Sequence, residues 1–101
     1  MKTIKFMGHR FKTEESEYIV FLPKFNGRSV EYVYRIALKW LNAERPMGNR
    51  VLLIGKDRFI LDAAGVYKWF GKVIKPDYTK DGWRLIPEST FYEAVKNYVR
   101  S

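Results

Sequence analysis

The chain has 101 residues, of which 47% are hydrophobic and 17% aromatic, values typical of a folded globular domain rather than a disordered segment. It has no cysteine, which excludes disulfide bonds and thiolate chemistry. The net charge of +8, from 19 Lys and Arg against 11 Asp and Glu, favours a polyanionic partner, usually nucleic acid. A chain of this length holds one modest core, so we expect residues 1–101 to form a single domain.

The start of the chain is strongly basic. Residues 1–13 carry four basic side chains and no acidic one, and three glutamates follow directly, Glu14, Glu15 and Glu17. These early charges interrupt any apolar stretch that would serve as a secretory signal, and no run in the chain reaches membrane-spanning length. We therefore expect a cytoplasmic protein that has no membrane partner.

Two strands are predicted before the first proline. Thr3–Phe11 alternates in the manner of a strand, and Gly8 within it marks a bulge or the strand end. Tyr18–Leu22 is a short apolar run of β-favouring residues, which predicts a buried strand antiparallel to the first and linked to it through the glutamate-rich turn.

Ser29–Glu44 predicts a helix more clearly than any other segment. Ser29 is a good N-cap, and Pro46 lies just beyond the far end. Most of the circumference is apolar, which indicates a core helix packed on two or three sides. Alternatively, Tyr32 and Trp40 are left free for a partner. The polar residues share one arc, namely Glu31, Arg35, Lys39 and Asn42.

Asp62–Lys75 is compatible with either a strand or an amphipathic helix. Val66–Ile74 is rich in β-favouring residues. Two glycines, Gly65 and Gly71, would each cost roughly 1 kcal/mol inside a helix, so we favour the strand.

The remaining elements are a hairpin, a last strand and a last helix. Arg50–Ile54 and Arg58–Leu61 predict the hairpin, and Trp83–Ile86 the strand. Ser89 or Thr90 is expected to cap the helix that ends the chain. The predicted class is therefore α+β: an antiparallel sheet of about four to six strands, packed on a central helix (29–44), with a C-terminal amphipathic helix (89–100).

The sequence holds no recognisable catalytic or metal-binding set. Metal sites need clustered His, Cys or carboxylate side chains, and the chain has one histidine, His9, with no nucleophile evidently beside it. Acid–base catalysis by a carboxylate pair stays open, although turns and caps explain the loop acids. We expect no cofactor, no metal and no enzymatic activity.

Basic residues interleaved with aromatic ones are the remaining functional signal. They form three clusters, at residues 9–12, 67–72 and 83–84. Lys and Arg neutralise phosphates, and exposed aromatic rings stack on unpaired bases. We therefore predict a non-enzymatic nucleic-acid-binding module. The predicted contact residues are Arg10, Lys12, Lys68, Trp69, Lys72, Lys75, Trp83 and Arg84.

Two other interpretations compete with this one. In the first, the aromatic rings face inward as core and the lysines form an ordinary solvated face. In the second, the chain is a small accessory or inhibitor protein, of viral or mobile-element type, that docks on an acidic host protein surface, because Tyr, Trp and Arg anchor interfaces. The sequence leaves the choice between DNA, RNA and protein open, as it does the oligomeric state.

Overall fold

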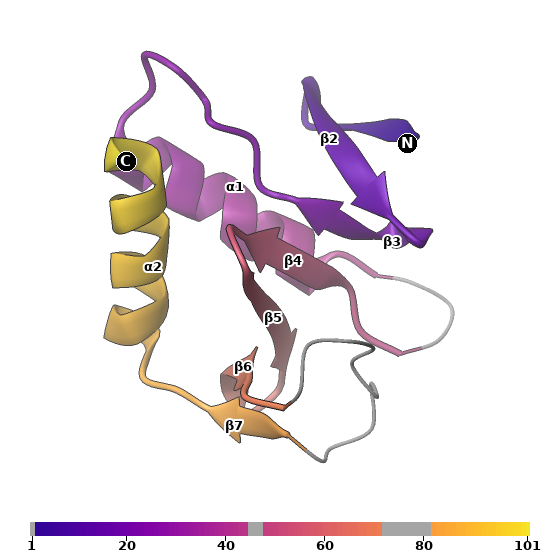
Figure 1. The fold of residues 1–101 in the computed structure, drawn as a ribbon, viewed down its shortest axis with the longest axis vertical. Helices are drawn as coiled ribbons and strands as arrows, with labels where there is room; N and C mark the ends of the chain where they lie inside the picture. The colour runs from indigo at the N-terminus through magenta and orange to yellow at the C-terminus, as the bar shows by residue number, and fades with distance from the viewer. Residues whose placement is uncertain (1, 45–47, 72–81) are drawn as a thin grey trace.

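The computed structural model describes residues 2–44, 48–71 and 82–101 (Figure 1). Within these ranges the chain forms seven strands and two helices, which confirms the α+β class. The elements are, in chain order, β1 (Thr3–Phe6), β2 (His9–Glu14), β3 (Ser16–Phe21), α1 (Val30–Asn42), β4 (Val51–Ile54), β5 (Asp57–Asp62), β6 (Gly65–Trp69), β7 (Trp83–Leu85) and α2 (Glu88–Arg100).

The strands lie side by side in their order along the chain, from β1 at one edge to β7 at the other. β1 pairs with β2 as a two-stranded sheet, which joins the larger sheet where β2 pairs with β3 across an irregularity at Thr13 and Glu14. Neighbouring strands are antiparallel except β3 and β4, so the wholly antiparallel prediction is wrong at this pair. These two run parallel because α1 forms the crossover between them.

The predicted single strand Thr3–Phe11 is wrong, because the segment folds back on itself as a hairpin. Met7 and Gly8 form the turn, with φ angles of 52° and 80°. Two central residues with positive φ match the right-handed twist of the flanking strands, as in a tight two-residue hairpin. Phe6 therefore faces His9 across the turn. The extra strand explains why the described residues form seven strands where four to six were expected.

Helix α1 begins where the sequence predicts. The Ser29 hydroxyl accepts a hydrogen bond from the backbone N–H of Tyr32 at 3.1 Å. The helix ends at Asn42, two residues before the predicted end, with Ala43 as its C-cap. Trp40 is fully buried and its ring N–H donates to the carbonyl oxygen of Val51 at 3.1 Å, so this side chain is not free for a partner. The buried side chains of α1 are Val30, Val33, Ile36, Ala37, Trp40 and Leu41.

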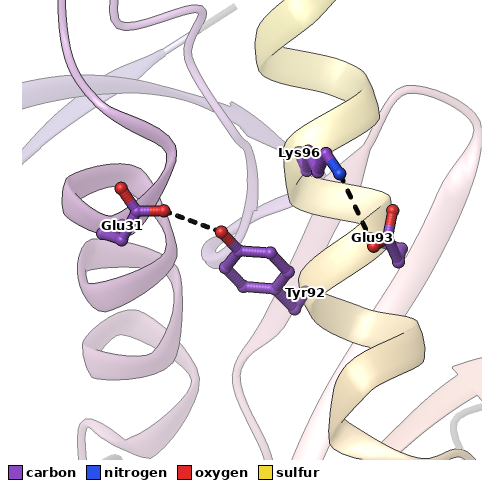
Figure 2. A network of polar contacts seen from close by, with 4 residues as sticks. All are labelled: Glu31, Tyr92, Glu93 and Lys96. Atoms are coloured by element: carbon purple, nitrogen blue, oxygen red, sulfur yellow. Dashed lines mark hydrogen bonds and ion pairs between the residues drawn. The ribbon is translucent and has the colours of Figure 1, made fainter.

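Helix α2 packs beside α1 but does not start at the predicted cap. The helix starts at Glu88, so Ser89 and Thr90 lie inside its first turn, and Pro87 occupies the cap position without a side-chain hydrogen bond. Proline serves here because its φ of −60° already suits a helix start. Two tyrosines bind the helices together. Tyr34 donates to Glu88 at 2.8 Å. Tyr92 donates to Glu31 at 2.7 Å, as Figure 2 shows.

The main core lies between the helices and one face of the sheet. It joins residues of α1 and α2, such as Trp40 and Phe91, to inward residues of the strands, such as Phe11 and Phe59. The opposite face of the sheet carries a second apolar cluster, formed by Ile19, Val51 and Leu53 with Phe21 and Ile60. Strand alternation produces both clusters, because successive side chains point to opposite faces.

The second half of the chain follows the sequence prediction in the described residues. β4 and β5 form the predicted hairpin, with Leu52 opposite Phe59. The ambiguous segment forms strand β6 over Gly65–Trp69, which pairs with β5 on one side and β7 on the other. Residues 72–75 lie outside the described residues.

Candidate functional site

Three basic side chains gather on the outer face of the β1–β2 hairpin. Lys5 lies directly opposite Arg10 in the register, and Lys12 lies opposite Thr3. Because Phe11 points into the core, the neighbouring Arg10 and Lys12 point away from it. All three cations are exposed, and none forms an ion pair or a side-chain hydrogen bond with another described residue. We call Lys5, Arg10 and Lys12 the basic face.

A pocket of about 400 Å³ adjoins the basic face, and we call it the basic pocket. Its lining combines cationic side chains with aromatic and apolar ones: Arg10, Lys12, Phe21, Leu22, Pro23, Lys24 and Tyr98. The residues come from β2, from the end of β3 with the loop that leaves it, and from the last turn of α2 (Figure 1). The fold thus places Arg10 and Lys12, from the predicted cluster at residues 9–12, in one pocket with Tyr98, which lies almost 90 positions later in the chain.

Lys24 in this pocket is already engaged by the end of α2. Its amine donates to the carbonyl oxygen of Tyr98 at 2.9 Å and lies 2.5 Å from the hydroxyl oxygen of Ser101. It also sits 4.1 Å from the centre of the Tyr98 ring. Cations at this position stabilise the unpaired carbonyls of a helix C-terminus. Arg10 and Lys12 are therefore the cations of the pocket that remain available to an anion.

The Tyr98 side chain lines the pocket as a neutral group. Its ring is half-buried, and burial raises the pKa of its hydroxyl above the ordinary value. A phenol is protonated at neutral pH even at its ordinary pKa, so Tyr98 presents a ring and a hydroxyl rather than a negative charge.

The far end of the hairpin has the opposite charge. Glu15 and Glu17 are exposed there, and Glu14 forms an ion pair with the buried Arg58 at 2.7 Å. A larger pocket of about 730 Å³ is lined by these three glutamates, with Lys2 as its one cationic lining residue among those described. An anion is therefore attracted to the Lys5–Arg10 end of the hairpin and repelled from the glutamate end.

The second and third predicted clusters present fewer unpaired charges than the basic face. Lys68 and Arg84 are direct partners in the β6–β7 register. The Lys68 amine lies 3.7 Å from an Asp57 carboxylate oxygen and 5.1 Å from the centre of the Phe70 ring. Arg84 is exposed and donates to the carbonyl oxygen of Trp83 at 3.3 Å. Lys72 and Lys75, also predicted as contacts, lie outside the described residues.

The two predicted tryptophans pack on each other. Trp69 and Trp83 have ring centres 5.2 Å apart with the planes at 61°, an edge-to-face contact. Trp83 is only 6% exposed, so the expectation that its ring stacks on a base conflicts with its burial. Trp69 is half-buried, and Gly71 and Gly82 lie so close that a Cβ on either would clash with its ring. The inward-facing interpretation thus describes this pair well, because β pairing sets Trp69 opposite Trp83.

The sequence prediction missed six members of the basic face and pocket, namely Lys5, Phe21, Leu22, Pro23, Lys24 and Tyr98. Lys5 lies opposite Arg10 because the chain reverses at the Met7-Gly8 turn. A sequence prediction that placed a turn there would also have predicted this cross-strand pair. Lys24 contacts Tyr98 although the two are 74 residues apart in the sequence. No local sequence pattern predicts this long-range contact.

Other site classes find no support in the described part of the chain. Within residues 2–44, 48–71 and 82–101, no three His, Cys, Asp or Glu side chains form a group able to hold a metal ion. Neither of the helices in these ranges has the length and apolar character that crossing a membrane requires. A search for relatives found no family model, no curated protein and no solved structure that matches the chain. Functional inference therefore depends on the chain's own surface geometry.

Proposed function

We propose that this chain is a non-enzymatic nucleic-acid-binding module, and that it contacts phosphates through the basic face. The observation that carries the proposal is the alignment of Lys5, Arg10 and Lys12 on one exposed face, without an acidic partner among the described residues. Free cations of this kind bind phosphates favourably, because the counterions they displace gain entropy. The overall charge of +8 adds long-range attraction for a polyanion.

The spacing of the basic face supports a linear array of anions as the ligand. Arg10 and Lys12 are two residues apart on the same strand, which separates their Cα atoms by about 7 Å. Lys5 extends the array sideways onto β1, directly opposite Arg10. A nucleic-acid backbone supplies repeated phosphates for such an array, whereas a single small anion would engage one or two of the cations.

The location of the proposed surface differs from the one the sequence favoured. The interleaved pattern favoured residues 67–75 and 83–84 as the binding surface. Those that belong to β6 and β7 lie at the opposite edge of the sheet from β1. There, Lys68 has a carboxylate nearby and Trp83 is buried. We therefore assign Arg10 and Lys12 the main role and give Arg84 a secondary one.

Salt-dependent binding to oligonucleotides tests the proposal. Fluorescence anisotropy with labelled single-stranded and duplex oligonucleotides is measured between 50 and 200 mM salt. Three phosphate contacts predict a log–log slope of roughly −2 for single strands and roughly −3 for duplex.

A charge-matched pair of variants locates the surface. The triple variant K5Q/R10Q/K12Q removes three charges from the basic face. The control R35Q/K39Q/K56Q removes three charges from exposed positions on α1 and in the β4–β5 turn. We expect the first to lose at least about tenfold in affinity and to flatten the salt slope, and the control to lose much less. Equal losses in both variants would contradict the assigned surface. Absence of binding to both oligonucleotides at 50 mM salt would overturn nucleic acid as the partner and return the choice to an acidic protein surface.

A further inference from the structure

We infer that the basic pocket is a subsite for one unstacked nucleotide, so that the nucleic acid bound is single-stranded. This inference rests on the proposed function and names the form of its ligand. In it, the phosphate meets Arg10 and Lys12, while the base contacts the rings of Phe21 and Tyr98. The juxtaposition of free cations and half-buried aromatic rings in one hollow carries the inference.

The phosphate part of the subsite follows from the register of the sheet. Thr13 pairs with Val20 in the antiparallel β2–β3 ladder, and the residues next to this pair, Lys12 and Phe21, both line the pocket. Because successive side chains of a strand point to opposite faces, Lys12 and Phe21 share the face of the sheet that Thr13 and Val20 do not occupy. A phosphate held by Lys12 therefore lies beside the Phe21 ring, within reach of the base attached to the same nucleotide.

The base part of the subsite follows from the aromatic lining. Phe21 and Tyr98 are each half-buried, which fixes the rings while leaving part of each open to the pocket. The Lys24 amine lies over the Tyr98 ring and donates to the Tyr98 carbonyl oxygen, so it links this residue to the loop that follows β3. Rings held in this way offer stacking surface at little cost in side-chain entropy, and stacking tolerates any base because every base has a π-face.

The shape of the pocket favours a single strand over a duplex. Its volume of about 400 Å³ is in the range of small-ligand sites. In a duplex the bases are paired and stacked, so the backbone alone would reach the rim and the aromatic lining would stay unused. A single strand can instead turn one base out of its stack and place it in the pocket.

Three probes of equal length test the inference by anisotropy at a fixed low salt concentration. They are a single-stranded oligonucleotide, its duplex, and a strand in which abasic sites replace the bases and every phosphate is kept. The single strand is used as both RNA and DNA. Contact between one base and the rings predicts that the intact single strand binds about tenfold tighter than the abasic strand.

Ring-removing variants assign this preference to the pocket. Phe21→Leu and Tyr98→Leu keep apolar packing but remove the rings, and Phe21→Tyr and Tyr98→Phe keep the rings. Tyr92→Leu is the matched control, because Tyr92 is a half-buried tyrosine of α2 outside the pocket. We expect the two pocket leucine variants to erase the preference for bases, and the ring-keeping variants and Tyr92→Leu to retain it. Thermal melts of each variant verify that it is folded at the assay temperature.

The outcomes separate this inference from the proposed function. Equal affinity for the intact and abasic strands, with a salt slope that depends on the basic face, would overturn the nucleotide subsite and leave phosphate binding in place. Tighter binding of the duplex than of either single strand would also overturn the subsite. Failure of every probe to bind would overturn both the subsite and the proposed function. A preference for bases that survives both leucine variants would place the stacking elsewhere and overturn the assignment to this pocket.

Discussion

The β1–β2 hairpin and the β6–β7 end of the sheet look alike in sequence, since both interleave basic and aromatic residues, yet the fold treats them differently. At the hairpin, Phe11 enters the core and stacks on Trp40 with ring centres 5.7 Å apart, while its neighbours Arg10 and Lys12 stay exposed. At the other end, Trp69 and Trp83 pack on each other, and Lys68 lies near Asp57.

The two regions differ in the charge of the residues that lie opposite or near their basic side chains. Across the β1–β2 ladder Arg10 meets another cation, Lys5, so repulsion keeps both available to an anion from outside. Near the β6–β7 end a carboxylate compensates part of the charge. A sequence that alternates basic and aromatic residues therefore predicts which residue types a surface contains. The residues paired across the strands decide whether its positive charges are free to bind an anion.

The largest expected effect concerns the anchoring of the hairpin in the core. Phe11→Ala removes a fully buried ring that contacts both Phe6 and Trp40, so we expect a loss of about 3–5 kcal/mol in the free energy of unfolding. Phe70→Ala, at a ring that is 58% exposed near the other end, should change stability by less than about 0.5 kcal/mol. Urea unfolding followed by tryptophan fluorescence measures both. Similar costs for the two variants would show that the hairpin is not anchored as described.

The next effect compares the charges at the two ends directly. R10Q/K12Q and K68Q/R84Q each remove two positive charges. We expect the first variant to lose about tenfold in affinity for a single-stranded oligonucleotide at 50 mM salt, and the second to lose less than about threefold. Anisotropy titrations measure both affinities. A larger loss from K68Q/R84Q would move the binding surface to the β6–β7 end.

A smaller effect on stability is expected at the turn of the β1–β2 hairpin. Met7 has a φ of 52°, a conformation that costs most side chains energy but that asparagine tolerates. Met7→Asn creates the Asn-Gly pair preferred in two-residue hairpin turns, so we expect a gain of about 0.5–1 kcal/mol in stability. Thermal unfolding measures the gain, with Met7→Ala as the control that keeps the strain. A loss of stability in Met7→Asn would contradict the turn geometry.

The smallest effect concerns a contact that is remote from both ends. The hydrogen bond from Tyr92 holds the pKa of the Glu31 carboxyl below its ordinary value of 4.5, with a further contribution from a backbone hydrogen bond (Figure 2). A lowered folded-state pKa stabilises the fold above the unfolded-state value, and that stability is lost as the pH falls through the folded-state value.

Tyr92→Phe should therefore raise the pKa of Glu31 and remove a small stabilisation that is present at neutral pH. An NMR titration of the Glu31 carboxyl carbon measures the pKa. Tyr34→Phe, which breaks the neighbouring contact with Glu88, is the control and should leave the Glu31 titration in place. An unchanged pKa in Tyr92→Phe would show that this hydrogen bond is not formed in solution.

The elements predicted correctly were those specified by local sequence. Ser29 caps α1 as expected, and the β4–β5 hairpin has its turn at Gly55, whose φ of 62° suits glycine. The Met7-Gly8 turn was missed because methionine rarely adopts positive φ, so the pair lacks the usual turn signature. The Pro87 cap was missed because serine and threonine are the stronger N-cap signals.

The candidate site was only partly predictable. Arg10 and Lys12 were named from their aromatic neighbours, and their exposure follows from strand alternation. Trp83 was assigned a stacking role because alternation does not reveal which face of a strand is covered. The contact of Lys24 with Tyr98 depends on how the end of α2 meets the loop that follows β3, and no local pattern encodes that meeting.

The parallel pairing of β3 with β4, the one parallel pair among the described strands, has a consequence for how the chain folds. Ile19 must find Val51 across the whole of α1, whereas tight turns of two residues connect β1 to β2, β4 to β5 and β5 to β6. Closing a loop of that length costs roughly 3 kcal/mol of chain entropy, more than a tight hairpin turn requires. The hairpins and α1 are therefore free to form first, and the β3–β4 ladder is the step that joins the two halves of the sheet. Substitutions in this ladder should slow folding more than they speed unfolding, if the joining step limits the rate.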